Sequence, residues 1–181
     1  FAVATIIMSI EEGKISQSFE LKVYHKTCAF DAAHILAGQN WQEELHGHGY
    51  TIAVTIKSKR LGDDGFVVDF SVVKRELKNL CQSFHNKVLI ATKSTILPVI
   101  DLEDHIRINA LHNTFYEFPK RVCALLPIYN SSTEELAKYV ADTIWGVLEP
   151  SIKEKGIIEF GAVVSEVYCQ QDGKFTMKIQ D

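Results

Sequence analysis

Three histidines in this sequence have a spacing that suits a metal ion: His34, His46 and His48. His46 and His48 are separated by one residue, and on a β-strand that spacing turns both side chains toward the same face. His34 can reach them from a neighbouring strand. Three neutral imidazoles suit zinc and leave a fourth coordination position open, which is the arrangement of catalytic zinc sites. The HGH pair is a weak signal by itself, so the predicted zinc site depends on its context.

The segments next to these histidines have the alternation of β-strands. In residues 50–59, isoleucine and valine alternate with smaller or polar residues, which is the pattern of a half-buried strand. The segment 19–30 alternates less regularly and predicts a neighbouring strand. Two more strands are expected near the end of the chain, at 157–169 and 174–179, with a turn at 170–173 between them.

Two helices are expected between these pairs of strands. The first would be capped by Ser71. The second would begin near Ser132, which has capping-box spacing to Glu135, and would end at Pro150. Their buried stripes would consist of Val73, Leu77, Leu80, Cys81 and Phe84 in the first helix and Leu136, Val140, Ile144 and Val147 in the second.

The order of the elements predicts an α+β fold in one domain over residues 1–181. The GDDG sequence at 62–65 predicts a turn, which would form a hairpin with a short strand at 66–69. Several short β-like runs at about 88–128 predict an inserted hairpin region. With strands at both ends and helices between them, the order is β-β-α, the insertion, then α-β-β.

Composition limits the classes of function. The chain has 181 residues, of which 46% are hydrophobic and 23% charged, as is typical of a globular domain. Its net charge of -4 argues against a general nucleic-acid binder, which needs a basic face. The cysteines are Cys28, Cys81, Cys123 and Cys169, without the CxxC spacing of a zinc ribbon or redox pair. Cys28, Cys81 and Cys169 lie in apolar stretches and are predicted to be buried thiols in a reducing compartment, so we expect a cytoplasmic protein.

The apolar run FAVATIIMSI at the start of the sequence has no basic residues before its apolar part, and acidic residues follow it. We interpret it as a strand or as the remnant of a longer chain, not as a signal peptide. No segment approaches the roughly 20 apolar residues that a membrane helix needs. Neither a membrane nor a nucleic acid is therefore expected as a partner.

Five short blocks, in this order along the chain, resemble the signature sequences of the 6-pyruvoyltetrahydropterin synthase family. They are FDAAHIL (30–36), LHGHGY (45–50), GFVVDF (65–70), SSTEELA (131–137) and VSEV (164–167). The resemblance implies the tunnelling fold, or T-fold, in which a four-stranded antiparallel sheet is backed by two helices. It also implies a homo-oligomer in which subunits close a β-barrel, commonly as a dimer of trimers. The order β-β-α-α-β-β deduced from the sequence pattern agrees with this fold.

The resemblance further implies roles for individual residues. It assigns the three histidines to zinc and Glu166 to the pterin ring. A carboxylate suits that ring because it can accept two parallel hydrogen bonds from the aminopyrimidine edge. Glu166 lies among valines, and a carboxylate in such an apolar stretch usually has a functional role. The backbone around Thr133 and Glu134 would line the same pocket.

The sequence departs from the typical synthases just before the HGH pair. Those synthases carry a cysteine there that abstracts a proton, whereas residues 40–44 read NWQEE. This arrangement resembles a branch of the family that uses a glutamate instead. Glu43 is therefore the predicted general base. Glu44 is its competitor, because strand parity can also place Glu44 on the face of His46, and both can instead be surface charges.

A second departure lies at residues 85–89. The family has Asp-His or Asn-His before Lys-Val-Leu, with the histidine as a proton relay, but here the order is His85-Asn86. Either the loop is shifted by one residue and His85 still acts, or Asn86 holds the relay position. In the second case the relay is lost, because an amide does not exchange a proton near neutral pH.

The leading hypothesis is a zinc-dependent lyase that acts on 7,8-dihydroneopterin triphosphate. It would cut the side chain between its first and second carbons to give 6-hydroxymethyl-7,8-dihydropterin, a folate precursor. Zinc would lower the pKa of the side-chain hydroxyls, and Glu43 would move the proton with help from His85. One alternative is the 6-pyruvoyl- or 6-carboxytetrahydropterin synthase reaction. Another is a catalytically inactive paralog that binds a pterin or a metal.

Overall fold

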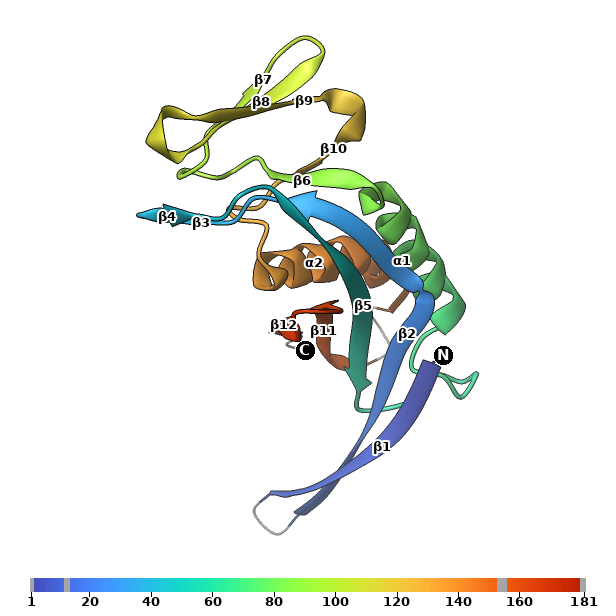
Figure 1. The fold of residues 1–181 in the computed structure, drawn as a ribbon. Coiled ribbons are helices and arrows are strands. Elements are labelled where there is room, and N and C mark those ends of the chain that lie inside the picture. The colour runs from blue at the N-terminus through green and yellow to red at the C-terminus, as the bar shows by residue number, and fades with distance from the viewer. Residues whose placement is uncertain (1, 12–13, 153–155, 180–181) are drawn as a thin grey trace.

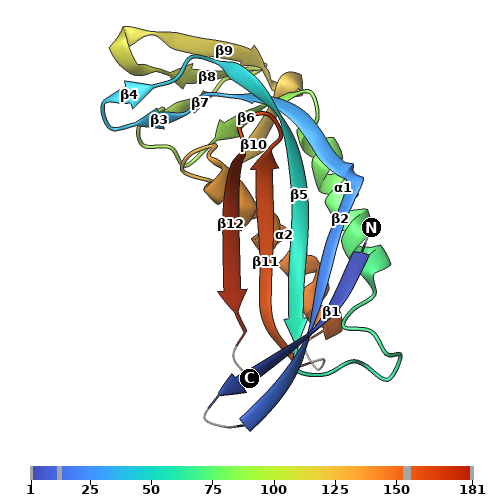
Figure 2. The same ribbon diagram turned by 60° about the horizontal axis from the view of Figure 1, so that its bottom comes forward.

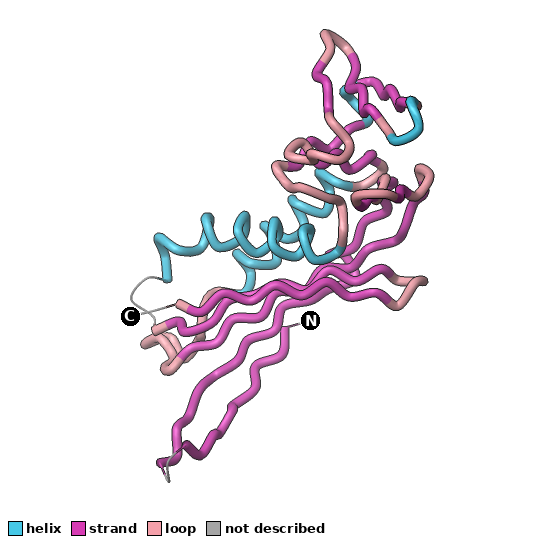
Figure 3. The backbone as a smooth tube through the Cα atoms, turned by 90° about the vertical axis from the view of Figure 1, so that its left-hand side faces the viewer, coloured by secondary structure: helices cyan, strands magenta, loops and turns pink. Residues whose placement is uncertain are grey.

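The computed structural model describes residues 2–11, 14–152 and 156–179, and a large mixed sheet forms its centre (Figure 1). The strands of this sheet lie in the order β10 (Cys123–Leu126), β6 (Lys87–Ala91), β2 (Lys14–His34), β5 (His46–Ser58), β11 (Ile157–Glu166) and β12 (Gln171–Lys178), and β1 (Ala2–Glu11) pairs with β2. The four strands β2, β5, β11 and β12 run antiparallel to one another in this order. Figure 3 shows the β1–β2 hairpin extending beyond the rest of the sheet.

Two helices, α1 (Phe70–Phe84) and α2 (Thr133–Ile152), cover one face of the sheet and lie behind it in Figure 2. Side chains alternate along each strand, so one side chain in two faces the helices. These core residues include Phe30 of β2, Ile52 and Val54 of β5, and Phe160 and Val164 of β11, all at most 3% exposed. The structure therefore confirms the predicted α+β fold, with a four-stranded antiparallel sheet backed by two helices.

The region 88–128, predicted as an inserted hairpin region, contributes strands to two sheets. β6 pairs in parallel with the end of β2, where Lys87 lies opposite Ala32, and β10 pairs in parallel with β6. Both strands therefore extend the main sheet. The strands β7 (Val99–Asp101), β8 (His105–Asn109) and β9 (Phe115–Pro119) form a separate antiparallel sheet, with short 3-10 helices at Leu111–Asn113 and Lys120–Val122.

The prediction of a strand at 66–69 is wrong, because this segment is irregular, with a bend at 67–68, and leads into α1. The Asp64 carboxylate accepts a hydrogen bond from the Phe66 amide at 3.1 Å, so this amide is satisfied locally instead of in a strand ladder. The predicted cap is also displaced. Asp69 is the N-cap of α1, and its carboxylate accepts a hydrogen bond from the Ser71 amide at 2.8 Å.

α2 follows its predicted apolar stripe at first and departs from it near its end. Leu136, Val140 and Ile144 are buried, but Val147 is 46% exposed and Leu148 is buried in its place. Leu148 comes four residues after Ile144 and thus stays on the same helical face. The helix also continues for two residues beyond Pro150. No helix in the described part of the chain is long and apolar enough to cross a membrane.

β12 begins earlier than predicted, and the preceding turn lies at 167–170 instead of 170–173. Gln170 adopts a positive φ of 55° in this turn. Gly173 is buried within the strand, and a Cβ atom on it would overlap the main chain of Thr133 and Glu134. The glycine is thus required by the close approach of α2 to β12, not by a turn.

We expect Gly173→Ala to destabilise the protein by about 1–3 kcal/mol, because the added methyl group must displace the first turn of α2. The free energy of unfolding from urea denaturation measures this effect. Gly146→Ala is the matched control, since Gly146 is exposed in α2 and a Cβ there meets nothing within 4 Å. That control should stabilise the protein by roughly 0.5–1 kcal/mol. Equal effects of the two substitutions would contradict the close approach as the cause.

Candidate active site

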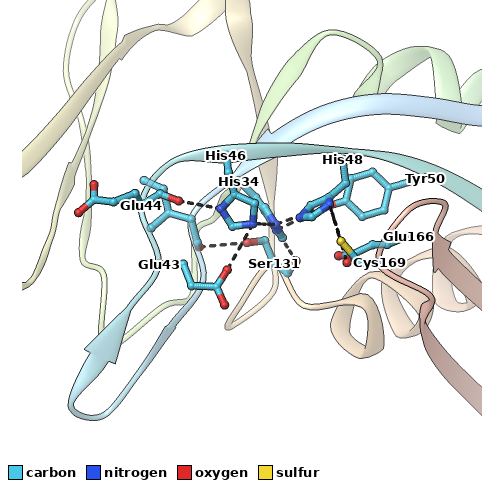
Figure 4. Close-up of polar contacts among 10 residues, drawn as sticks. His34, Glu43, Glu44, His46, His48, Tyr50, Ser131, Glu166 and Cys169 are labelled. Carbon is cyan, nitrogen blue, oxygen red and sulfur yellow. Dashed lines mark hydrogen bonds and ion pairs between the residues drawn. The ribbon is translucent and has the colours of Figure 1, made fainter.

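The three histidines predicted to bind a metal come together where β2 ends and β5 begins (Figure 4). His34 lies directly opposite His46 in the strand pairing, and His48 lies opposite Ala32. One nitrogen from each of the three rings lies within 4.8 Å of the others, and the Nε2 atoms of His34 and His46 are 3.2 Å apart. We call His34, His46 and His48 the histidine trio. Its side chains lie on the face of the sheet that the helices cover.

Hydrogen bonds orient the rings of the trio. The Nδ1 atom of His34 lies 3.0 Å from the carbonyl oxygen of Ser131, and Nδ1 of His46 lies 2.7 Å from the carbonyl oxygen of Glu44. A carbonyl oxygen only accepts hydrogen bonds, so each of these Nδ1 atoms is the protonated donor. The Nε2 atoms then keep a free lone pair, as a metal-binding imidazole requires. The donor set therefore fits a zinc ion held through Nε2 nitrogens.

Burial favours the same protonation state at His34. Its side chain is fully buried, and the resulting loss of hydration lowers its pKa from 6.5 to about 4. The nearby His46 and His48 act in the same direction, while the hydrogen bond to Ser131 opposes them. His34 is therefore neutral at physiological pH, which is the form that binds a metal.

Glu166, predicted to hold the pterin, lies at the end of β11 beside the trio and is 5% exposed. Its carboxylate is 4.0 Å from Nδ1 of His48. Cys169 also approaches this nitrogen, with its sulfur at 3.4 Å. The prediction that Cys169 is buried is wrong, because it lies exposed in the turn after β11. Cys28 and Cys81 are buried as predicted, and burial raises the pKa of the Cys81 thiol to about 12.

The two candidate bases, Glu43 and Glu44, point in different directions. They follow a small hairpin of β3 (Ala37–Gly38) and β4 (Trp41–Gln42), and the Glu43 amide donates to the carbonyl of Leu36 at 2.8 Å. The Glu43 carboxylate lies 3.3 Å from Nε2 of His46 and is about half exposed. The Glu44 carboxylate instead accepts a hydrogen bond from the hydroxyl of Tyr116. Of these two carboxylates, it is Glu43 that faces the trio.

The start of α2, which contains Thr133 and Glu134, is tied to the end of β2. The hydroxyl of Ser131 donates to the carbonyl of Ile35 at 3.2 Å, so this loop also holds the carbonyl that orients His34. Thr133 is 5% exposed. The Ser132 hydroxyl accepts from the Glu135 amide at 3.4 Å. The Glu135 carboxylate bonds to the amide of Tyr129 instead, so only half of the predicted capping box forms.

His85 and Asn86 lie away from the trio of the same chain. The Asp31 amide donates to Nδ1 of His85 at 3.1 Å, and the Asn86 amide donates to the carbonyl of Asp31 at 2.8 Å. Asp31 is three positions from His34 on β2, so its side chain points to the opposite face of the sheet. On that face, Asp31, Asn86 and Lys87 line a cavity of about 550 Å³, which Gly47 and Gly49 of β5 also border.

Tyr50 is a residue of the site that the sequence reasoning did not single out. It is fully buried, and its hydroxyl lies 3.4 Å and 3.5 Å from the two ring nitrogens of His34. Burial is the main cause that raises the pKa of Tyr50, and the charges of Glu166 and Cys169 add to it. The phenol therefore stays protonated as a donor. Its position, two residues after His48 on the same strand face, was the available signal.

The chain thus combines a mixed sheet, covered on one face by two helices, with three histidines that converge beside two carboxylates at the ends of two central strands. This arrangement is that of a candidate metal site in an α+β fold. A profile of the family described as 6-pyruvoyl tetrahydropterin synthase matches residues 23–163. A putative 6-carboxy-5,6,7,8-tetrahydropterin synthase of Methanocaldococcus jannaschii is 34% identical over 125 residues, which cover 69% of this chain and 76% of that protein.

Solved structures agree with these sequence matches. The crystal structure of 6-pyruvoyltetrahydropterin synthase from Plasmodium vivax aligns with a TM-score of 0.84 and 29% identity, covering 91% of this chain and 100% of that chain. A P. vivax variant whose catalytic residue, a glutamate, is replaced by alanine aligns with a TM-score of 0.83 and 28% identity, again over 91% and 100%.

The chain belongs to the 6-pyruvoyl tetrahydropterin synthase family. It has the T-fold of the P. vivax synthase, which confirms the fold that the five sequence blocks implied. It is therefore grouped with the lyases of pterin biosynthesis. The matched region contains the whole trio, Glu43 and the start of α2.

Proposed function

We propose that this protein is a zinc-dependent lyase that converts 7,8-dihydroneopterin triphosphate to 6-hydroxymethyl-7,8-dihydropterin. The observation that carries the proposal is the convergence of the trio with the Glu43 carboxylate 3.3 Å from His46. The resemblance to the family implies a cysteine a few residues before the HGH pair in its typical synthases, and in this chain that segment reads NWQEE. The catalytic glutamate of the P. vivax synthase is a precedent for such a carboxylate in a close structural relative.

The trio would hold the zinc ion, which polarises the side-chain hydroxyls of the substrate when it is bound. Glu43 would accept the proton that leaves the side chain, as a general base within hydrogen-bond reach of the site. As the bond between the first and second side-chain carbons breaks, the ionised hydroxyl of the second carbon would become the carbonyl of an aldehyde that leaves with the triphosphate. The electrons of the broken bond would stay with the first carbon, and Glu43 would return the proton to this carbon to give the hydroxymethyl group.

Glu166 would anchor the pterin ring. Its side chain is almost completely buried, and one carboxylate oxygen lies 4.0 Å from Nδ1 of His48. A buried carboxylate needs strong donors, and the aminopyrimidine edge of a pterin offers two parallel N–H groups. The backbone of Thr133 and Glu134, at the start of α2, would complete this pocket.

The alternative product is that of a 6-carboxy- or 6-pyruvoyltetrahydropterin synthase, which the M. jannaschii relative and the family description favour. The test is incubation of the zinc-loaded protein with 7,8-dihydroneopterin triphosphate and identification of the product by mass spectrometry. We expect 6-hydroxymethyl-7,8-dihydropterin. A 6-pyruvoyl or 6-carboxy product would replace the proposed reaction, and no product from protein with a full complement of zinc would favour an inactive paralog.

We also propose that the active site is completed between subunits of a homo-oligomer. The long edges of the sheet would be left unpaired in a monomer, and His85 faces away from the trio of its own chain. A His85 that acts as proton relay must then come from a second copy. Light scattering at micromolar concentration should give an oligomeric mass, and a monomeric mass would contradict this arrangement.

Complementation between two inactive variants tests the shared site directly. Glu43→Gln and His85→Ala should each be nearly inactive alone, whereas co-expressed chains should recover part of the wild-type turnover. The recovery is expected because some mixed sites would combine an intact Glu43 from one copy with an intact His85 from another. Asn86→Ala is the companion variant. Full activity of His85→Ala together with loss in Asn86→Ala would assign the second role to Asn86.

A further inference from the structure

The outer nitrogens of the trio have unequal partners. Nδ1 of His34 and Nδ1 of His46 each face a main-chain carbonyl oxygen, at 3.0 Å and 2.7 Å. Nδ1 of His48 faces two side chains instead, the sulfur of Cys169 at 3.4 Å and the carboxylate of Glu166 at 4.0 Å. Outer partners of this kind fix the ring orientation of a metal-binding histidine and tune its basicity.

We propose that Cys169 is a positioning residue for the metal centre, which accepts the Nδ1 proton of His48 and thereby directs Nε2 of His48 to the metal. This inference rests on the proposed zinc site. It adds a residue outside the five family blocks, in a turn that the sequence pattern alone did not place near the histidines.

The backbone holds Cys169 in this position. The turn at 167–170 is bonded to the strand of the trio, because the Val167 amide donates to the carbonyl of Gly49 at 2.8 Å. Gly49 immediately follows His48, so this bond fixes the turn next to the ring that Cys169 contacts. The left-handed conformation of Gln170, with φ of 55°, closes the turn behind the thiol.

The distances favour Cys169 over Glu166 as the partner of His48. The contact of 3.4 Å lies within hydrogen-bond range for sulfur, whereas 4.0 Å is too long for a carboxylate oxygen to accept a direct hydrogen bond. Glu166 therefore stays outside hydrogen-bond distance of His48, as a pterin anchor separate from the metal centre requires. Without the thiol, the ring of His48 could turn toward the carboxylate, which would misplace its Nε2 atom and occupy the pterin anchor.

The test compares the wild type with Cys169→Ala and Cys169→Ser, each stripped of metal and titrated with zinc against a chromophoric chelator. Cys169→Ala should weaken zinc binding by about 10-fold, the lower end of the usual effect of an outer partner. Cys169→Ser should restore most of the affinity, because a hydroxyl oxygen also accepts a hydrogen bond. Cys123→Ala, in β10, is the control for loss of a thiol elsewhere in the chain.

Cobalt substitution gives a readout that a general effect on the fold would not produce. In the NMR spectrum of the cobalt protein, each histidine bound through Nε2 should give one exchangeable Nδ1 proton shifted by the metal. In Cys169→Ala, only the His48 signal should broaden through faster exchange with water, and Cys169→Ser should restore it.

Three results would overturn the inference. In the first, Cys169→Ala leaves both zinc affinity and the three proton signals unchanged. In the second, the wild-type cobalt protein shows a sulfur-to-cobalt charge-transfer band that Cys169→Ala lacks, which would make Cys169 a metal ligand. In the third, the wild type binds no zinc, which would also refute the proposed function and is thereby distinguishable from the other two.

Discussion

Replacing His46 with alanine is expected to remove the bound zinc and the catalytic activity together. His46 is a partly exposed residue at the start of β5, so its loss should leave the core intact. Two imidazoles are too few for a stable catalytic zinc site, which has three protein ligands. Turnover should therefore fall by more than the roughly 10–100-fold that removal of an outer partner costs. Elemental analysis by mass spectrometry measures the zinc content, and product formation measures turnover.

The control for this substitution is His105→Ala, which removes an exposed imidazole from β8, outside the main sheet. It should leave both zinc content and turnover at the wild-type level. The assignment of the trio would be wrong if His46→Ala kept its zinc. Loss of zinc with retained turnover would instead mean that the metal has no part in the reaction.

Glu43→Gln is expected to reduce turnover by about 10²-fold or more, the usual scale of a lost general base. Glutamine keeps the size and the hydrogen-bonding oxygen of the side chain but cannot accept a proton. The Glu43 carboxylate lies 3.3 Å from Nε2 of His46, so the substitution changes a group next to the reacting atoms. Glu43 is not one of the proposed zinc ligands. Zinc content should stay intact while the rate of product formation falls.

Glu44→Gln is the matched control, since it makes the same chemical change at the next residue. The Glu44 carboxylate bonds to Tyr116, and the contact of Glu44 with His46 uses only the main-chain oxygen, which the substitution keeps. Its effect on turnover should be small. The opposite ranking of the two variants would move the base to Glu44, and normal turnover in both would remove the glutamate mechanism.

A contact with a residue distant in sequence determines which of the Glu43 and Glu44 carboxylates faces the trio. Strand parity near His46 allowed either carboxylate to face the trio, because the small hairpin before β5 breaks the regular alternation. The partner that draws Glu44 away is Tyr116, 72 positions further along the chain. No local pattern around residues 40–46 contains this contact, so the sequence left both candidates open.

The errors in the predicted elements have one local and one long-range cause. The apolar FVV sequence at 66–68 looked like a strand, but Asp64 satisfies the Phe66 amide locally and Asp69 begins α1. Gly173 looked like a turn residue, but its lack of a side chain serves the approach of α2. The first error therefore comes from local side-chain hydrogen bonds, whereas the second depends on which distant segment packs against the glycine.

The sequence by itself determined four strands of the sheet, the two helices and the common face of His46 and His48, because these follow from alternation and helical periodicity within single segments. That β6 and β10 extend the same sheet was decided by the tertiary structure. The resemblance of the five sequence blocks to the family further predicted the T-fold. Only the tertiary structure decided that Glu43 faces the trio, that His85 faces away from it, and that Cys169 contacts His48 across 121 positions of sequence. These facts depend on long-range packing, since a side chain's neighbours in space are set by the whole fold and not by its own segment.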